Sequence, residues 1–120
     1  MLKLNSNNIN LFNVKIIEFL NFLENIIEDK YAKKKINKSI NKINLALKID
    51  INIISNLFYE KIYIHNKDIN NENEKVLKVF QIHLFDNKLD LEKLWLTINC
   101  SDKEIIWKYL KVFILLFEQK

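Results

Sequence analysis

The sequence predicts an all-α fold, a compact single-domain bundle of five or six helices with an apolar C-terminal helix at its centre. Three observations lead to this prediction. Apolar residues recur at helical spacing in several segments, no pair of alternating runs with turn residues is present, and the chain has no Gly and no Pro. A length of 120 residues suits one domain. We place it at residues 9–120, after a short frayed lead-in at residues 1–8.

The first two predicted helices are long and amphipathic. The first covers residues 9–29, with Asn7 or Asn8 as its N-cap. Its apolar side chains fall within one arc of the helix: Ile9, Phe12, Ile16, Phe19, Leu20, Leu23, Ile26 and Ile27. The second covers residues 31–48 and has a narrower apolar stripe, from which Leu45 points nearly opposite. We expect this helix to lie at the periphery and to contact the core along one seam.

The third predicted helix runs from Ile51 to about Tyr63, and Asp50 is its expected N-cap. Ile49, Ile51 and Ile53 also alternate as residues of a strand do. We favour the helix over the strand, because a strand would need a partner that the sequence does not offer.

Residues 64–73 form the most loop-like stretch of the chain. In the absence of Gly, we expect Asn residues to take the left-handed backbone conformation that turns require. A fourth helix is predicted at residues 72–85, and Asp90 is the expected cap of a short helix at residues 91–97.

The last predicted helix is the best marked. Ser101 and Glu104 have the spacing of a capping box, directly before an apolar run that covers most of the helix circumference. A helix with so broad an apolar surface is packed from several sides, so we expect it at the centre of the bundle. The predicted large anchors of the core are Trp107, Tyr109, Phe113 and Trp95.

The composition excludes several classes of site. Without Gly, the chain cannot build a P-loop, a dinucleotide fingerprint or a nucleophile elbow, and without Arg it has no bidentate guanidinium for phosphate. The single Cys100 excludes an internal disulfide and favours a reducing compartment. We expect a protein that is soluble, intracellular, not secreted and not membrane-spanning. The abundance of Ile, Asn and Lys indicates a genome of low G+C content.

The positive charge is concentrated in one segment. Residues 1–29, 30–48 and 49–120 have net charges of −2, +7 and −1, which together give the net charge of +4. The middle segment contains seven Lys and no acidic residue.

Four of these lysines, Lys30, Lys34, Lys38 and Lys42, recur at intervals of four along the second helix. Like charges at this spacing repel one another, so something must offset the cost. The ladder is a candidate phosphate-contacting face. The alternatives are a simply solvated surface, or pairing with Glu24, Glu28 and Asp29 of the first helix.

Few residues could carry catalysis. His65, His83 and Cys100 could in principle form a Cys–His pair or a set of three zinc ligands. The spacing of these three residues matches no metal-binding or catalytic motif, and ordinary roles in a loop, a helix and the core explain them better. We therefore predict no enzyme activity, no metal, no cofactor and no small-molecule substrate.

The C-terminal segment 101–117 resembles the ending of a family of small helical proteins encoded by giant viruses, the nucleocytoplasmic large DNA viruses. There a polar cap leads into an Ile-Trp-Lys-Tyr-Leu core and an apolar tail, and residues 106–110 here read Ile-Trp-Lys-Tyr-Leu. Looser similarity covers residues 12–20, 57–62 and 91–95. The resemblance implies a compact helical fold and a location in the host-cell cytoplasm, viral factory or virion. It implies no activity.

The sequence thus predicts a non-enzymatic viral accessory or structural module that acts by protein–protein interaction, with another protein or with itself. The alternative is a sequence-independent nucleic-acid-binding protein that uses the lysines of residues 30–42, on the basic helix 31–48.

Overall fold

The computed structural model describes residue 4 and residues 6–118, and all regular structure within them is helical. The all-α prediction is confirmed. These residues form seven α-helices and two short 3-10 helices, more than the five or six helices predicted. Their bounds are α1 (Ser6–Ile26), α2 (Lys30–Ile49), α3 (Ile53–Lys61), η1 (Tyr63–His65), α4 (Asn66–Asn70), η2 (Glu74–Val76), α5 (Leu77–Phe85), α6 (Leu91–Trp95) and α7 (Cys100–Glu118).

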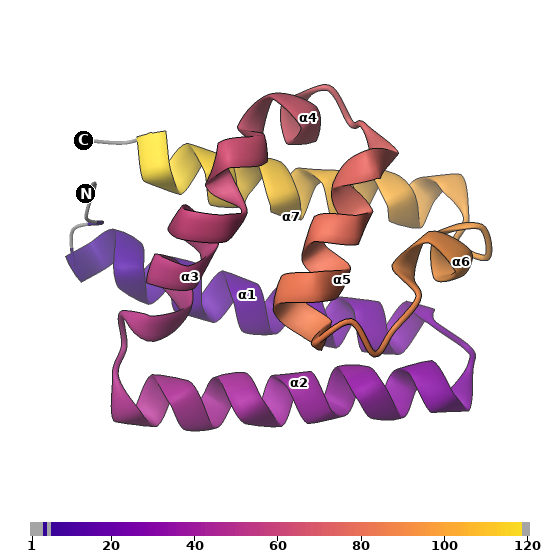
Figure 1. Ribbon diagram of the computed structural model, residues 1–120, viewed down its shortest axis with the longest axis horizontal. Coiled ribbons are helices and arrows are strands. Elements are labelled where there is room, and N and C mark those ends of the chain that lie inside the picture. The colour runs from indigo at the N-terminus through magenta and orange to yellow at the C-terminus, as the bar shows by residue number, and fades with distance from the viewer. Residues whose placement is uncertain (1–3, 5, 119–120) are drawn as a thin grey trace.

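The three long helices determine the shape of the molecule. Helix α1 lies between α2 and α7, packs against both and runs antiparallel to each (Figure 1). Helices α3 and α5 cross this layer on one face, α4 covers part of α7, and α6 lies beside α5 at one end (Figure 1). Helix α2 therefore lies at the edge of the bundle, as its narrow apolar stripe predicts.

An aromatic cluster fills the core. Phe113 of α7 is fully buried, and its ring centroid lies 5.3–5.9 Å from those of Phe12, Phe19 and Phe58. Helix α7 contributes seven buried residues, more than any other helix described, although α1 and not α7 is the middle one of the three long helices. Rings at these separations attract one another beyond their hydrophobic burial. Helices α1, α3 and α7 are therefore held by one shared set of contacts.

The other predicted anchors are Trp95 on α6 and Trp107 and Tyr109 in the middle of α7. Trp95 and Trp107 are buried and meet edge to face, with centroids 5.5 Å apart. Tyr109 is only half-buried, because it faces Phe19 and Phe22 at the margin of the contact between α1 and α7.

The N-terminal boundary differs from the prediction. Helix α1 begins at Ser6, so Asn7 and Asn8 lie inside the helix and neither is its N-cap. Leu4 is buried against the core. The remaining residues of the predicted lead-in, 1–3 and 5, lie outside the described residues.

Two other predicted caps are wrong. Asp50 ends α2, and its carboxylate accepts the backbone N–H of Asn52 at 2.9 Å, so α3 begins only at Ile53. At α7, the side chain of Asn99 accepts the N–H of Asp102 at 2.8 Å, in place of the predicted capping box at Ser101. The predicted cap at Asp90 is confirmed, since its side chain accepts the N–H of Lys93.

The predicted loop at residues 64–73 is mostly short helices, η1 and α4. They are anchored by Ile69, which is fully buried, and α4 packs against α7. The non-glycine residues with positive φ in the described part are Glu72, Asp86 and Asn87, so Asn alone does not supply the left-handed turns.

Candidate functional site

Helix α2 divides sharply into a buried stripe and an open face. Its first turn is capped by Asp29, whose carboxylate accepts the N–H of Ala32 at 3.0 Å. Its buried residues recur at helical spacing and face the bundle: Ala32, Ile36, Ser39, Ile40 and Ile43. The lysines lie on the rest of the circumference, together with Tyr31, Leu45, Ile49 and several Asn residues.

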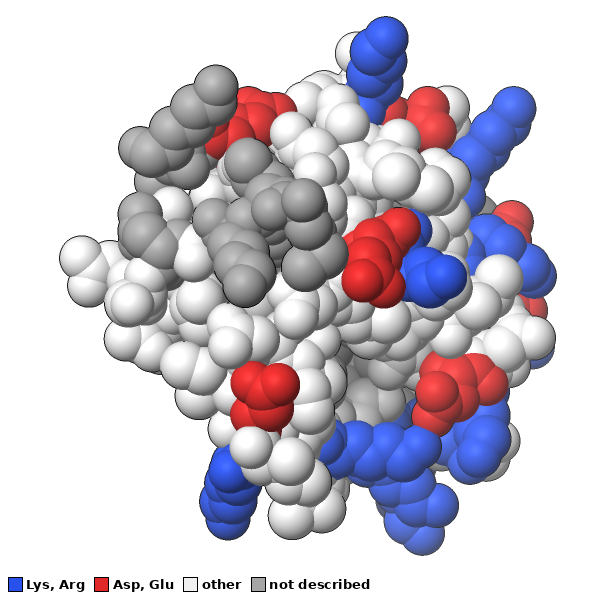
Figure 2. All heavy atoms as spheres, turned by 60° about the vertical axis from the view of Figure 1, so that its left-hand side comes forward, with Lys and Arg blue, Asp and Glu red and all other residues white. Residues whose placement is uncertain are grey.

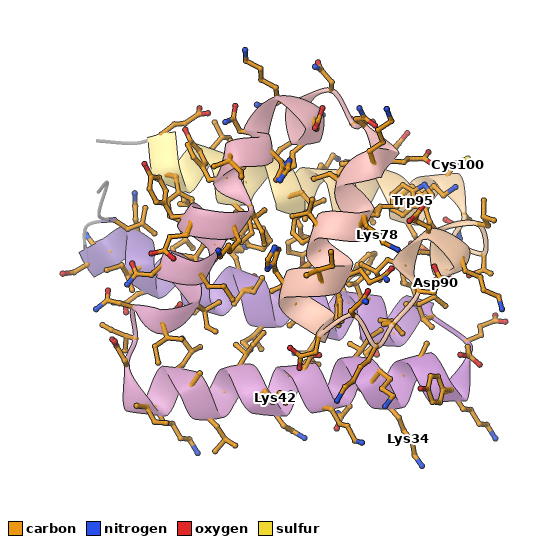
Figure 3. The ribbon with its side chains drawn as sticks, viewed as in Figure 1. Lys34, Lys42, Lys78, Asp90, Trp95 and Cys100 are labelled. Atoms are coloured by element: carbon orange, nitrogen blue, oxygen red, sulfur yellow. The ribbon has the colours of Figure 1, made fainter. Side chains whose placement is uncertain are left out.

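All four lysines of the predicted ladder, Lys30, Lys34, Lys38 and Lys42, are exposed. Each step of four residues overshoots one helical turn by about 40°, so the ladder winds around the outside of α2. We call these four residues, with Lys35, the lysine face. Lys34 points away from the bundle (Figure 3). Lysine side chains gather along the lower edge of the molecule, at the level of α2 (Figure 2).

Pairing with the acidic residues of the first helix is not how the ladder is balanced. Within the described residues, no lysine of α2 forms an ion pair with the carboxylates of Glu24, Glu28 or Asp29. Lys33 does reach Glu24, but its ammonium donates to the backbone carbonyl at 2.6 Å. That alternative is therefore wrong for the structure.

The acidic partner of the face comes instead from the end of α5. Lys42 Nζ lies 2.6 Å from Asp86 Oδ2, and both side chains are more than half exposed. The hydrogen bond from Lys42 lowers the pKa of Asp86, partial burial opposes this, and the charges of Lys42 and Lys88 lower it further. Lys42 is thus the one ladder residue with an ion pair in the described structure.

The loop after α5 is held in place by Gln81, which is only 6% exposed. Its side-chain amide donates to Asn87 Oδ1 at 2.7 Å, and its carbonyl accepts the N–H of Leu91 at 3.1 Å. Left-handed backbone at Asp86 and Asn87 turns the chain sharply here. As a result, Asp86 and Lys88 are presented next to α2.

A pocket of about 220 Å³ lies between α2 and this loop. We call it the lysine pocket. It is lined by Lys35, Lys38, Ser39, Lys42, Phe85, Asp86 and Lys88. Four lysines and one aspartate give it three net positive charges.

Five of the seven pocket residues were not predicted from the sequence: Lys35, Ser39, Phe85, Asp86 and Lys88. Lys35 lies off the spacing of four, and its ammonium lies 5.2 Å from the ring centroid of Tyr31. Ser39 falls on the apolar stripe and looks like a core residue. Lys88 is distant in sequence, and only the α5–α6 turn brings it to α2. A serine interrupting an apolar stripe beside lysines was the one local signal available.

The lysine face also carries exposed apolar side chains. Tyr31, Lys38 and Leu45 are seven residues apart, as are Lys42 and Ile49, and this spacing places residues on the same side of a helix. Leu45 is 61% exposed and Ile49 is 81% exposed. Leu45 thus points away from the buried stripe, as predicted, and continues the face toward the end of α2.

The histidines and Cys100 do not form a metal site. No group of three His, Cys, Asp or Glu side chains in the described part of the chain could hold a metal ion. His65 lies in η1, His83 is half-buried on α5, and Cys100 is exposed at the start of α7. Burial lowers the pKa of His83, and the positive charges of Lys61 and His65 lower it further.

No helix in the part of the chain that the structure describes has the length and apolar character needed to cross a lipid bilayer. No family model, no curated protein and no solved structure matches this chain. Inferences about its function therefore depend on the charge, burial and geometry of its own residues.

Proposed function

We propose that this protein is a non-enzymatic interaction module that binds an acidic segment of another protein through the outer surface of α2. The observation that carries the proposal is the juxtaposition of unpaired lysines with exposed apolar residues on one helix face. Lys34 and Lys38 form no ion pair with any described residue, and Leu45 and Ile49 continue the same face.

Charge complementarity indicates the kind of partner. Segment 30–48 carries seven positive charges, while the remainder of the chain carries a net charge of −3. Like charges four residues apart cost an isolated helix about 0.2–0.5 kcal/mol per pair. Acidic side chains from a partner would offset this repulsion and speed the association.

The apolar residues favour a protein over a nucleic acid. Leu45 and Ile49 can bury hydrophobic surface against a partner helix, whereas a charged phosphate backbone offers no apolar surface for these side chains to contact. Nucleic-acid binding is the second candidate, and the exposed ladder Lys30, Lys34, Lys38 and Lys42 favours it. Tyr31 is the only aromatic residue on α2, so stacking on single-stranded bases has little support.

A titration with two probes tests the proposal. The first probe is a synthetic helical peptide with glutamates and leucines on one face, and the second is a short DNA duplex. We expect the double substitution Leu45→Ser and Ile49→Ser to weaken peptide binding about tenfold and to leave DNA binding unchanged. The matched control is Val14→Ser, which removes a similarly exposed apolar residue from α1.

Peptide affinity that is unaffected by the double substitution, or tighter binding of the duplex, would overturn the proposal in favour of the second candidate. Light scattering gives an independent reading. A dimer that disappears in the Leu45→Ser and Ile49→Ser variant would make the partner a second copy of this chain, and the proposal of a different protein would then be wrong.

The same proposal places the protein inside a host cell as an accessory or structural component of a giant virus, in the cytoplasm, viral factory or virion. The resemblance of segment 101–117 supports this part. Its test is isolation of the tagged protein from infected cells with and without nuclease treatment. Co-purification of a protein that survives nuclease is the expected result, and recovery of nucleic acid alone would contradict it.

A further inference from the structure

We infer that the lysine pocket binds the phosphate group of a phosphorylated serine or threonine on the acidic partner. This inference rests on the proposed function, because the phosphate belongs to the partner that docks on α2. It adds a defined subsite to what is otherwise a surface of general charge complementarity.

The charges of the pocket match a phosphate monoester. Lys35, Lys38 and Lys42 come from α2, and Lys88 comes from the opposite wall. Asp86 leaves three net positive charges among these residues. A phosphorylated side chain carries about −1.5 to −2 charges at neutral pH and three acceptor oxygens, and each lysine ammonium offers three donors.

Ser39 supplies a neutral donor at the wall of the pocket. The residue as a whole is only 8% exposed, and its hydroxyl has no hydrogen-bond partner among the described residues. The buried side-chain atoms that lack a partner in the described part of the chain are Asn13 Oδ1 and Trp95 Nε1, so the Ser39 hydroxyl is reached by water and can offer its hydrogen bond to the pocket. A phosphate oxygen in the pocket would accept this hydrogen bond.

The size of the pocket also favours a phosphate group over a larger ligand. Pockets that enclose drug-sized molecules have volumes of roughly 300–1,000 Å³. The lysine pocket, at about 220 Å³, is smaller. It suits the end of one side chain better than a whole nucleotide.

Its shape favours a single phosphate group over a nucleic-acid backbone. A backbone presents singly charged phosphates in a row, which matches the ladder Lys30, Lys34, Lys38 and Lys42 along the outside of α2. The pocket instead gathers lysines from α2 and from the loop after α5 around one recess, which Ser39 and Phe85 also line. One doubly charged group fits this arrangement.

Asp86 acts as a competitor for the phosphate. In the structure its carboxylate holds Lys42 at 2.6 Å, so an entering phosphate must take over Lys42 and face the negative charge of Asp86. Removing that charge should therefore strengthen binding. The substitution Asp86→Asn suits this test, because Asn adopts the left-handed conformation of this position readily.

The experiment is a heteronuclear NMR titration of the full chain with O-phosphoserine, at an ionic strength kept constant with chloride. We expect saturable shifts of the backbone amides of Lys35, Ser39, Lys42 and Lys88. Ser39→Ala should weaken binding about tenfold, and Asp86→Asn should tighten it about two- to fivefold. Lys48→Gln, on the same helix outside the pocket, is the matched control and should leave binding unchanged.

Small unsaturable shifts at lysines over the whole surface, or equal affinities for the Ser39→Ala, Asp86→Asn and parent chains, would overturn the inference. The same spectra report whether each variant is folded. If the parent chain binds the acidic peptide but not phosphoserine, the inference about the pocket is wrong and the proposed function stands. Saturable phosphoserine binding without peptide binding would support the pocket and count against the wider peptide-binding face.

Discussion

Gln81 offers the sharpest test of how the fold positions the lysine pocket. The substitution Gln81→Met keeps the length and approximate volume of the side chain, but it removes the hydrogen bonds at 2.7 Å to Asn87 and at 3.1 Å from Leu91. Each such bond contributes about 1 kcal/mol, and both bonds are partly buried. We expect the free energy of unfolding to fall by about 2 kcal/mol.

Urea denaturation followed by circular dichroism measures this change, and hydrogen exchange locates it. The Leu91 amide should exchange about 30-fold faster, since 1.4 kcal/mol corresponds to a factor of ten. The control is Asn44→Ala on the exposed face of α2, which should change stability by less than about 0.5 kcal/mol. If Gln81→Met matched this control, or if the Leu91 amide kept its protection, Gln81 would not hold the loop.

Three further predictions concern a helix cap and two titrating groups. Asn99→Ala should destabilise the chain by about 1 kcal/mol in urea, while Ser101→Ala should cost less than about 0.5 kcal/mol, since Asn99 caps α7; equal costs would contradict this cap. The folded-state pKa of His83 lies below its ordinary 6.5, so the unfolded chain takes up the proton first and stability falls as pH drops below that value. His83→Gln should flatten this part of the stability profile, and an unchanged slope would count against it. The pair Lys42–Asp86 stabilises the fold above the ordinary Asp pKa of 3.8, and this contribution is lost as pH falls through the lower folded-state pKa. Lys42→Gln should move the carboxyl titration of Asp86, followed by NMR, back toward 3.8, and a titration that stays where it was would refute the pairing.

The long helices were predictable because the spacing of apolar residues along each segment shows which face of the helix is buried. The apolar stripe predicted on α2 is Ala32, Ile36, Ile40, Ile43 and Leu47. The first four residues are buried as the periodicity predicts, and Leu47 near the end of the helix is half-buried. The short helices at residues 63–76 were not predictable in the same way. Their sequence is polar, and they are held by a few long-range contacts, such as the buried Ile69, that no local pattern reveals.

Helix ends were harder to predict than helix bodies. Asn, Ser and Asp are all good caps, and in an Asn-rich chain several candidates stand within one turn of each boundary. Backbone geometry decides between them, as it does for Asn99 over Ser101 at α7. At α3 the N-cap position falls on Asn52 and not on Asp50, and the Asn52 side chain makes no capping hydrogen bond. These shifts are small and leave the buried faces unchanged.

The candidate site was predictable in part. The concentration of lysines on α2 is a property of the sequence, and all four ladder residues are exposed. The pocket is a tertiary feature, because Asp86 and Lys88 reach α2 through a left-handed turn that Gln81 holds in place. Local spacing carries no information about that approach.

The most direct test of α2 as the binding surface is a charge reversal with a matched control. Lys34→Glu with Lys38→Glu is compared with Lys67→Glu and Lys108→Glu, which make the same change in net charge at exposed sites on α4 and α7. Affinity for the acidic peptide is measured by isothermal titration calorimetry at several salt concentrations. We predict that the first pair lowers affinity at least tenfold and reduces its salt dependence, while the second pair has little effect. Equal losses from both pairs would show that net charge alone drives binding, and the assignment of the site to α2 would then be wrong.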